Sequence, residues 1–161
     1  MDPGKTHILE PGALRAETTS VSTRTFPADR TAPRAAASWL RSLPTGLTET
    51  RLSDAELCLD ELVTNVIRYA WADTSQADPH AVVIAVDRSA SELEIVVQDD
   101  GRAFDPTTAA LPSFPHTLDE ATPGGRGLLL VRSIAPRLSY ERRDGVNRVT
   151  LAFPIEAAEN A

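Results

Sequence analysis

The stretch Asp60-Glu-Leu-Val-Thr-Asn-Val-Ile-Arg-Tyr-Ala70 decides how this chain folds. When residues are placed about 100° apart around a helical wheel, the apolar side chains here and just upstream form one broad face. This face consists of Leu52, Ala55, Leu59, Leu62, Val63, Val66 and Ala70. The spacing therefore predicts a long helix that packs one side against a hydrophobic core.

The opposite face of the same helix is polar and has two interpretations. It carries Asp54, Glu61, Asn65 and Arg68, which fall within roughly 60° of one another on the wheel. One interpretation is a solvated helix surface. The other is a site, because a carboxylate can take a proton, an amide oxygen can bind Mg²⁺ and a guanidinium matches phosphate oxygens.

Composition limits the class of protein. The chain has 161 residues, 42% of them hydrophobic, which is enough for one globular domain with a core. A net charge of −7 without a basic cluster argues against nucleic acid as a direct partner. The single cysteine, Cys58, excludes an internal disulfide and is expected to be a buried thiol. With no apolar run of membrane-spanning length and no signal-peptide pattern, we expect a cytoplasmic protein without membrane contact.

The remaining periodicity predicts an α+β fold. Alternating apolar residues indicate strands over 18–26, 81–87, 93–98, 138–142 and 148–153, the last two joined by a turn at Asp144-Gly145. Helical spacing indicates helices over 33–43, from Thr48 or Ser53 to about 70, and over 127–135. We expect a two-layer α/β sandwich with a mixed, mostly antiparallel sheet and the helices on one face. The predicted domain is 18–154, between tails at 1–17 and 155–161.

A first glycine motif follows the third predicted strand, in Val97-Gln-Asp-Asp-Gly-Arg-Ala-Phe-Asp105. An aspartate and a glycine after a strand are often only a turn. Alternatively, Asp99 is a fixed carboxylate acceptor suited to an exocyclic amine such as that of adenine. Gly101 would then let the backbone turn and come close to a flat ligand.

A second glycine motif, Gly124-Gly-Arg-Gly-Leu-Leu-Leu-Val131, opens the last predicted helix. Glycines at a helix start expose N–H groups that attract phosphate, although an ordinary hinge has the same composition. Between the two motifs, residues 105–124 contain four prolines and few apolar residues. A loop of this length in a compact domain is usually functional, so we predict a mobile lid.

Together these segments resemble the nucleotide-binding domain shared by type II topoisomerases, histidine kinases and mismatch-repair ATPases, the GHKL superfamily. Within it, residues 18–153 are most similar to the bacterial anti-sigma-factor serine/threonine kinases. Glu61-Leu-Val-Thr-Asn65 with Arg68-Tyr-Ala70 matches the asparagine box of that superfamily. Asp99-x-Gly101-x-x-Phe104-Asp105 matches the first glycine box, and Gly125-Arg-Gly127-Leu128 matches the second.

The resemblance implies a Bergerat-type ATP-binding fold and a role for each matched residue. Asn65 would bind Mg²⁺ through its side-chain oxygen, Glu61 would be the general base and Asp99 would accept the adenine amine. The glycines Gly101, Gly125 and Gly127 would allow close packing around the nucleotide and lid movement. The other residues expected at the nucleotide are Arg68, Phe104, Arg126 and Leu128. Ala103 stands where the family often has a second glycine, and it would weaken ATP binding if that position needs a left-handed backbone.

The resemblance also implies partners and an activity. The favoured hypothesis is an ATP-dependent serine/threonine protein kinase that acts as an anti-sigma factor. It would bind a sigma factor, phosphorylate an antagonist protein with a STAS domain, and form homodimers through its first strand and helix. The second hypothesis is a non-catalytic ATP-binding module that sequesters a protein partner. A third is a structural domain that binds no nucleotide.

Overall fold

The computed structural model describes residues 18–74, 79–111 and 126–156. In chain order these residues form β1 (Thr18–Pro27), α1 (Ala32–Ser42), α2 (Glu49–Tyr69), β2 (Ala81–Ser89), β3 (Glu92–Asp99), α3 (Arg126–Ile134), β4 (Arg137–Arg143) and β5 (Val146–Pro154). The predicted helices and strands are therefore confirmed, with their ends shifted by a few residues at most.

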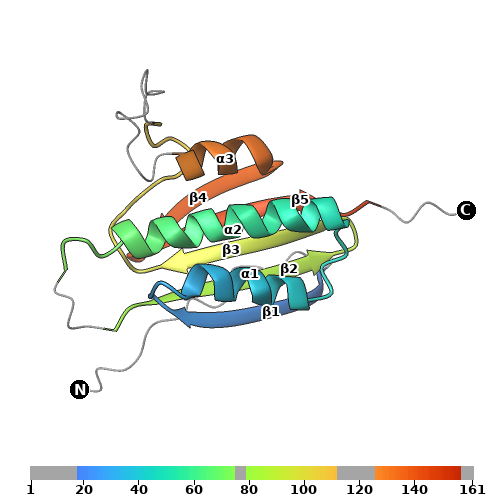
Figure 1. Ribbon diagram of the computed structural model, residues 1–161, viewed down its shortest axis with the longest axis horizontal. Coiled ribbons are helices and arrows are strands. Elements are labelled where there is room, and N and C mark those ends of the chain that lie inside the picture. Colours follow the sequence, from blue (N-terminus) through green and yellow to red (C-terminus); the bar gives the residue numbers. More distant parts are fainter. Residues whose placement is uncertain (1–17, 75–78, 112–125, 157–161) are drawn as a thin grey trace, which may run out of the picture.

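The five strands form one sheet in the order β1-β2-β3-β5-β4, and each neighbouring pair is antiparallel. All three helices lie on the same face of this sheet, with α2 running along its middle (Figure 1). This arrangement confirms the predicted two-layer α+β sandwich. In the described sheet, the pairing is antiparallel throughout rather than mixed.

The core lies between α2 and the central strands. Along β2, β3 and β5, every second side chain points to the helices and is buried. These inward residues include Val82, Ile84, Val86, Leu93, Ile95, Val97, Val149, Leu151 and Phe153. Every predicted residue of the apolar face of α2 is buried except Val66, which is half-buried. Cys58 is fully buried as expected, and burial raises the pKa of its thiol to about 12.

One of the two predicted starts of the central helix is correct. Thr48 has extended backbone angles, and its side chain accepts a hydrogen bond from the N–H of Arg51 at 3.3 Å, as an N-cap does. Ser53 lies inside the helix, so the alternative start predicted there is wrong. The earlier start gives Leu52 a helical position, from which its side chain is buried in the core.

The β4–β5 connection is the predicted tight turn. Asp144 and Gly145 have φ values of 51° and 81°, the left-handed pair that a two-residue hairpin requires. This turn sets the register in which Asn147 lies opposite Asp99 of β3 and Arg142 of β4. β4 and β5 thus bring the polar side chains of Arg142 and Asn147 to the end of β3.

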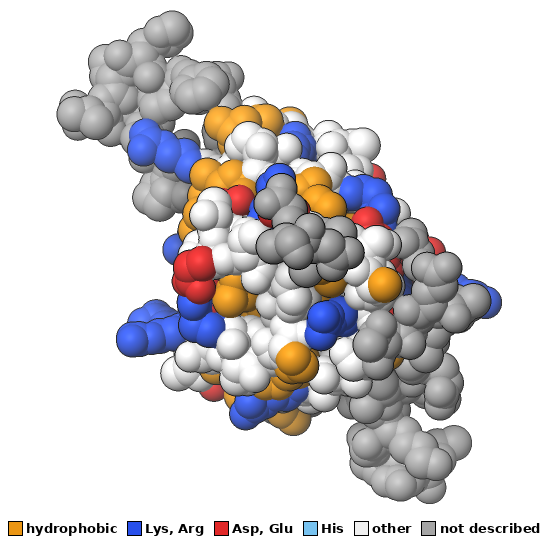
Figure 2. All heavy atoms as spheres, turned by 90° about the vertical axis from the view of Figure 1, so that its right-hand side faces the viewer, with side chains coloured by type: hydrophobic (Ala, Val, Ile, Leu, Met, Phe, Trp, Pro, Cys, Tyr) orange, Lys and Arg blue, Asp and Glu red, His pale blue; other side chains and the backbone are white. Residues whose placement is uncertain are grey.

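The opposite end of the sandwich carries the β2–β3 turn and the start of α2 (Figure 1). Seen from that end, hydrophobic and charged side chains are interspersed, and the Arg side chains stand apart in small groups (Figure 2). Among the helices of the described residues, none is long and apolar enough to cross a membrane.

Candidate functional site

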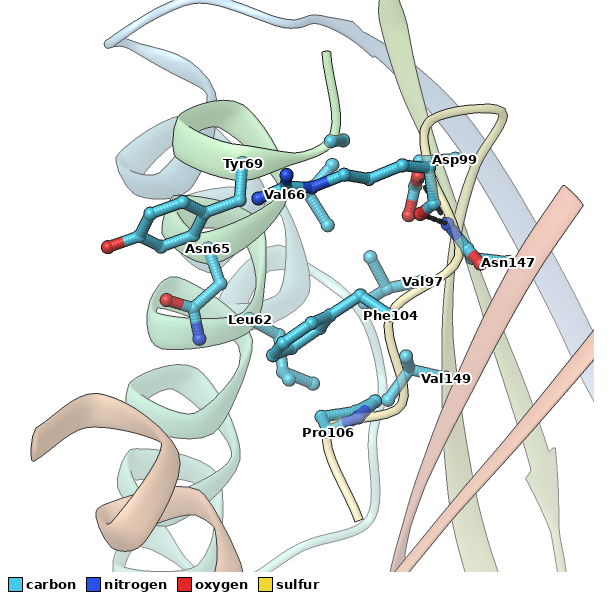
Figure 3. Close-up of a pocket in the computed structure, with 12 residues that line it drawn as sticks. Leu62, Asn65, Val66, Tyr69, Val97, Asp99, Phe104, Pro106, Asn147 and Val149 are labelled. Atoms are coloured by element: carbon cyan, nitrogen blue, oxygen red, sulfur yellow. Dashed lines mark hydrogen bonds between the residues drawn. The ribbon is translucent and has the colours of Figure 1, made fainter. Parts of the chain in front are cut away.

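A pocket, partly open to solvent, lies between the C-terminal half of α2, the end of β3 and the start of β5 (Figure 3). The residues that line it are Leu62, Asn65, Val66, Tyr69, Ala70, Val97, Asp99, Arg102, Phe104, Pro106, Asn147 and Val149. Most are apolar, and the polar ones are few. An apolar lining with a few polar groups is typical of sites for small organic ligands.

Asp99, at the end of β3, is the buried acid of this pocket, with only 6% of its surface exposed. Its Oδ1 accepts hydrogen bonds from the Gly101 N–H at 3.0 Å and from Asn147 Nδ2 at 2.9 Å. Within the described residues, Oδ2 accepts none. Burial raises the pKa of Asp99, and these two hydrogen bonds oppose that rise. The carboxylate is therefore fixed through one oxygen and has the other available to a ligand.

Gly101 lies directly against the C-terminal end of α2. A Cβ added here would come within 2.6 Å of the carbonyl oxygen of Ala70, and the next residue, Arg102, donates its N–H to that oxygen at 2.8 Å. Its φ is not positive. The glycine is therefore required by close helix contact rather than by a left-handed backbone. Ala103 also lacks a positive φ, so the condition under which it would weaken ATP binding is not met in this structure.

Glu61 lies beneath the start of α3. A Cβ added at Gly127 would overlap the Glu61 carboxylate, so this glycine lets the helix come down onto that acid. Asn65 follows Glu61 by about one turn of α2 and lines the pocket, whereas Glu61 does not. The structure thus brings the asparagine box and the second glycine box into direct contact. Within α3, Arg126 is exposed and Leu128 is buried.

Arg68 is separated from the other polar residues of α2. It lines a second hollow on the other side of the helix, together with Trp71 and His80, whose rings stack with centroids 4.5 Å apart. The indole N–H of Trp71 donates to Asp100 at 3.0 Å, so this hollow adjoins the turn that carries Asp99. The expected contact of Arg68 with phosphate stays a prediction.

The end of the first glycine motif and the residues just after it close one side of the pocket. Phe104 lies between α2 and β5 and remains 40% exposed (Figure 3). Arg132 of α3 holds this segment through hydrogen bonds from Nε to the Pro106 carbonyl at 2.8 Å and from Nη2 to the Ala109 carbonyl at 2.6 Å. Gly125 and most of the predicted lid, residues 112–124, lie outside the described residues.

Asn147 is a site residue that the sequence analysis missed. Only 3% of it is exposed, and its amide bonds Asp99, the Arg102 carbonyl, Tyr140 and Arg142. In the sequence it lies between the predicted turn at Asp144-Gly145 and the predicted strand over 148–153. The strand begins earlier than predicted, at Val146, and an asparagine inside a strand is disfavoured unless its side chain has hydrogen-bonding partners.

Comparison with known protein families identifies the domain. The histidine kinase-like ATPase domain matches residues 26–153, which include the pocket, Glu61, Asn65 and the first glycine motif. The chain belongs to this family. Membership implies ATP as the ligand of the domain, as the resemblance of the three motifs predicted.

Curated relatives of the ATPase domain are protein kinases. The chain is 39% identical over 95 residues to the serine/threonine-protein kinase BtrW of Bordetella bronchiseptica, a match that covers 59% of this chain. It is 27% identical over 105 residues to the serine-protein kinase RsbW of Staphylococcus aureus, over 63% of this chain. Each match spans 65% of the length of the relative.

A solved structure has the same fold. The RsbU and RsbW domains of Rv1364c from Mycobacterium tuberculosis superpose on 83% of this chain with a TM-score of 0.56 and 17% sequence identity. The superposition covers 32% of that longer protein. Because the sequence identity is low, this similarity is evidence for the fold of the domain alone.

Proposed function

We propose that this chain binds ATP with Mg²⁺ in the pocket beside α2 and transfers the γ-phosphoryl group to a serine or threonine of a protein. The observation that carries the proposal is the hydrogen bonding of Asp99. This buried carboxylate accepts two hydrogen bonds at Oδ1 and has Oδ2 available to a ligand. An acceptor of this kind suits the exocyclic amine of adenine, and the apolar walls suit its flat ring. The kinase names of the two curated relatives support the transfer step.

The polar residues of α2 would act on the phosphate end of the nucleotide. The amide oxygen of Asn65 is a hard ligand of the kind that Mg²⁺ accepts, and the ion neutralises phosphate charge when it is bound. Glu61 would take the proton of the acceptor hydroxyl. Arg126, at the start of α3, and Arg68 would complement the phosphates. Phosphoryl transfer depends mainly on such positioning and charge neutralisation.

The proposed setting follows from the family resemblance. The kinase would act in the cytoplasm as an anti-sigma factor that binds a sigma factor and phosphorylates a STAS-domain antagonist. We expect homodimers formed through β1 and α1. The position of β1 supports this surface, because among the described strands β1 lies at the edge of the sheet, where a further strand can pair with it.

A second candidate function is ATP-dependent sequestration of a protein without phosphoryl transfer. The position of Glu61 favours it, since the acid contacts Gly127 and does not line the pocket. In that case nucleotide binding would fix the shape of a docking surface, and the acid would stabilise the start of α3.

Calorimetric titration with ATP and with GTP, each with and without Mg²⁺, tests the binding part of the proposal. We expect ATP to bind and GTP to bind more weakly, because guanine carries a carbonyl where adenine has its amine. Incubation with γ-labelled ATP and a candidate antagonist tests transfer. Label on a serine or threonine of the antagonist supports the kinase, whereas ATP binding without label supports sequestration. Absence of ATP binding contradicts both.

A further inference from the structure

Arg142 contacts the base of the pocket from a strand that does not line it. It belongs to β4, an edge strand that contributes no residue to the pocket lining. Its Nη1 donates to Asn147 Oδ1 at 2.7 Å and to the Gly101 carbonyl at 3.0 Å. One guanidinium nitrogen therefore joins the β4–β5 hairpin to the glycine turn that follows Asp99.

These hydrogen bonds leave the Asn147 amide a single orientation. Arginine can only donate, so Oδ1 must face Arg142, and the Tyr140 hydroxyl donates to the same oxygen at 2.8 Å. Nδ2 then faces two acceptors, Asp99 Oδ1 at 2.9 Å and the Arg102 carbonyl at 2.8 Å. Rotating the amide would bring its oxygen against both acceptors and its NH₂ group against Arg142. The guanidinium therefore stabilises the same orientation of Asn147 that the two acceptors require.

Arg142 also influences the charge on Asp99. Burial raises the pKa of Asp99, the neighbouring Asp100 raises it further, and Arg142 lowers it. The other titratable or charged groups lining this pocket are Arg102 after β3 and Tyr69 on α2. A carboxylate must be ionised to accept a charge-assisted hydrogen bond from an amine.

We propose that Arg142 is a positioning residue for base recognition, which holds Asn147 and the Gly101 turn so that Asp99 presents one ionised oxygen to the nucleotide. The inference rests on the proposed ATP binding. It adds that a residue outside the pocket helps to hold the Asp99 carboxylate in place, through Asn147 and the Gly101 carbonyl, and favours its ionised form.

The first test measures Asp99 without nucleotide, by carbon NMR of its carboxyl group across a pH titration of the full chain. Arg142→Gln keeps an amide donor near Asn147 and removes the charge, whereas Arg142→Lys keeps the charge. The control is Arg143→Gln, since that side chain is exposed and forms an ion pair with Asp144 at 3.8 Å, next to it in the sequence. We expect a higher titration midpoint in Arg142→Gln than in the parent, and parental midpoints in Arg142→Lys and Arg143→Gln.

The second test measures ATP affinity by calorimetry over the same pH range, with thermal unfolding as the check on folding. We expect about tenfold weaker binding for Arg142→Gln near neutral pH, as for a lost hydrogen bond to a charged group. The loss should increase as the pH falls, because the variant protonates Asp99 sooner. Arg142→Lys should bind with intermediate affinity and keep the parental pH dependence.

Two results would overturn the inference. One is an Asp99 midpoint that is unchanged in Arg142→Gln, and the other is an ATP affinity equal to that of Arg143→Gln at every pH. Failure of the parent to bind ATP would instead contradict the proposed function, while the NMR titration would still decide whether Arg142 controls the charge on Asp99.

Discussion

The two ends of the sandwich use polar residues in opposite ways. At the end shown in Figure 2, Arg41 of α1 reaches Glu49 at 2.8 Å and, through its Nε, Glu56 of α2 at 2.7 Å. These hydrogen bonds raise the pKa of Arg41, so the charged groups complement one another. At the pocket end, Asp99 Oδ2 and the Asn65 amide bond no other described residue. These two groups are therefore available to a ligand.

The difference also involves backbone packing. At the pocket end, Gly101 and Gly127 bring the chain against Ala70 and Glu61 with no space for a side chain. At the other end, Gly46 has a φ of 75° and lies beside the flexible Arg88 guanidinium. Glycine is needed at position 46 because the turn there has a positive φ. Paired substitutions at the two ends therefore test whether the pocket end is specialised for function.

The largest effect is expected for Glu61→Gln. The substitution preserves the shape that fits against Gly127 and removes the proposed base, so transfer should fall by about 10²–10⁴-fold while ATP affinity stays near the parental value. Glu56→Gln, in the N-terminal half of α2, is the matched control and should transfer normally. The measurement is the rate of antagonist phosphorylation together with calorimetric ATP affinity. Full transfer by Glu61→Gln would remove the residue from catalysis.

Asp99→Asn should weaken ATP binding by about 1.5–3 kcal/mol, as expected for a lost hydrogen bond to a charged group. Gly101 and Asn147 both donate to Oδ1, so the amide oxygen takes that place and the new NH₂ group faces the adenine amine. Glu49→Gln neutralises a carboxylate at the opposite end and serves as the control in the same titration. Equal affinities of both variants and the parent would exclude Asp99 from the site.

Gly101→Ala should lower the free energy of unfolding by about 1–3 kcal/mol, because the added methyl group overlaps Ala70. It should also impair ATP binding, since the turn that holds Asp99 must shift. Gly46→Ala should lose about 1 kcal/mol through its positive φ and leave ATP binding unchanged. Urea unfolding and calorimetry measure the two effects. Similar ATP affinities for both variants would contradict the proposed contrast between the ends.

The smallest effect is expected for Arg41→Met. Its partners lie on the surface, where ion pairs contribute little and are screened by salt. The urea midpoint should fall slightly at low ionic strength, and 1 M NaCl should remove most of the difference. ATP affinity and transfer should match the parent at both salt concentrations. A loss of nucleotide binding in this variant would show that the two ends are coupled.

Local patterns were sufficient to predict most of the fold. The apolar face of α2 and the alternation in β2, β3 and β5 reflect burial of one side of each element, and this burial repeats with the period of the backbone. The turn at Asp144-Gly145 was equally visible, because few residues adopt its left-handed angles. The start of α2 was ambiguous, since Thr48 and Ser53 both have capping side chains and only packing in the core distinguishes them.

The sequence by itself determined the two-layer fold, the family resemblance and the candidates Asn65, Asp99 and Phe104, all of which line the pocket. Only the tertiary structure showed that Arg68 lines a different hollow from Asn65, and that the Glu61 carboxylate lies against Gly127. It alone connected Asp99 to Asn147, 48 residues away, and through it to Arg142. The physical reason is that a helical wheel gives the direction of a side chain, whereas its partners depend on which distant strands the sheet pairs together.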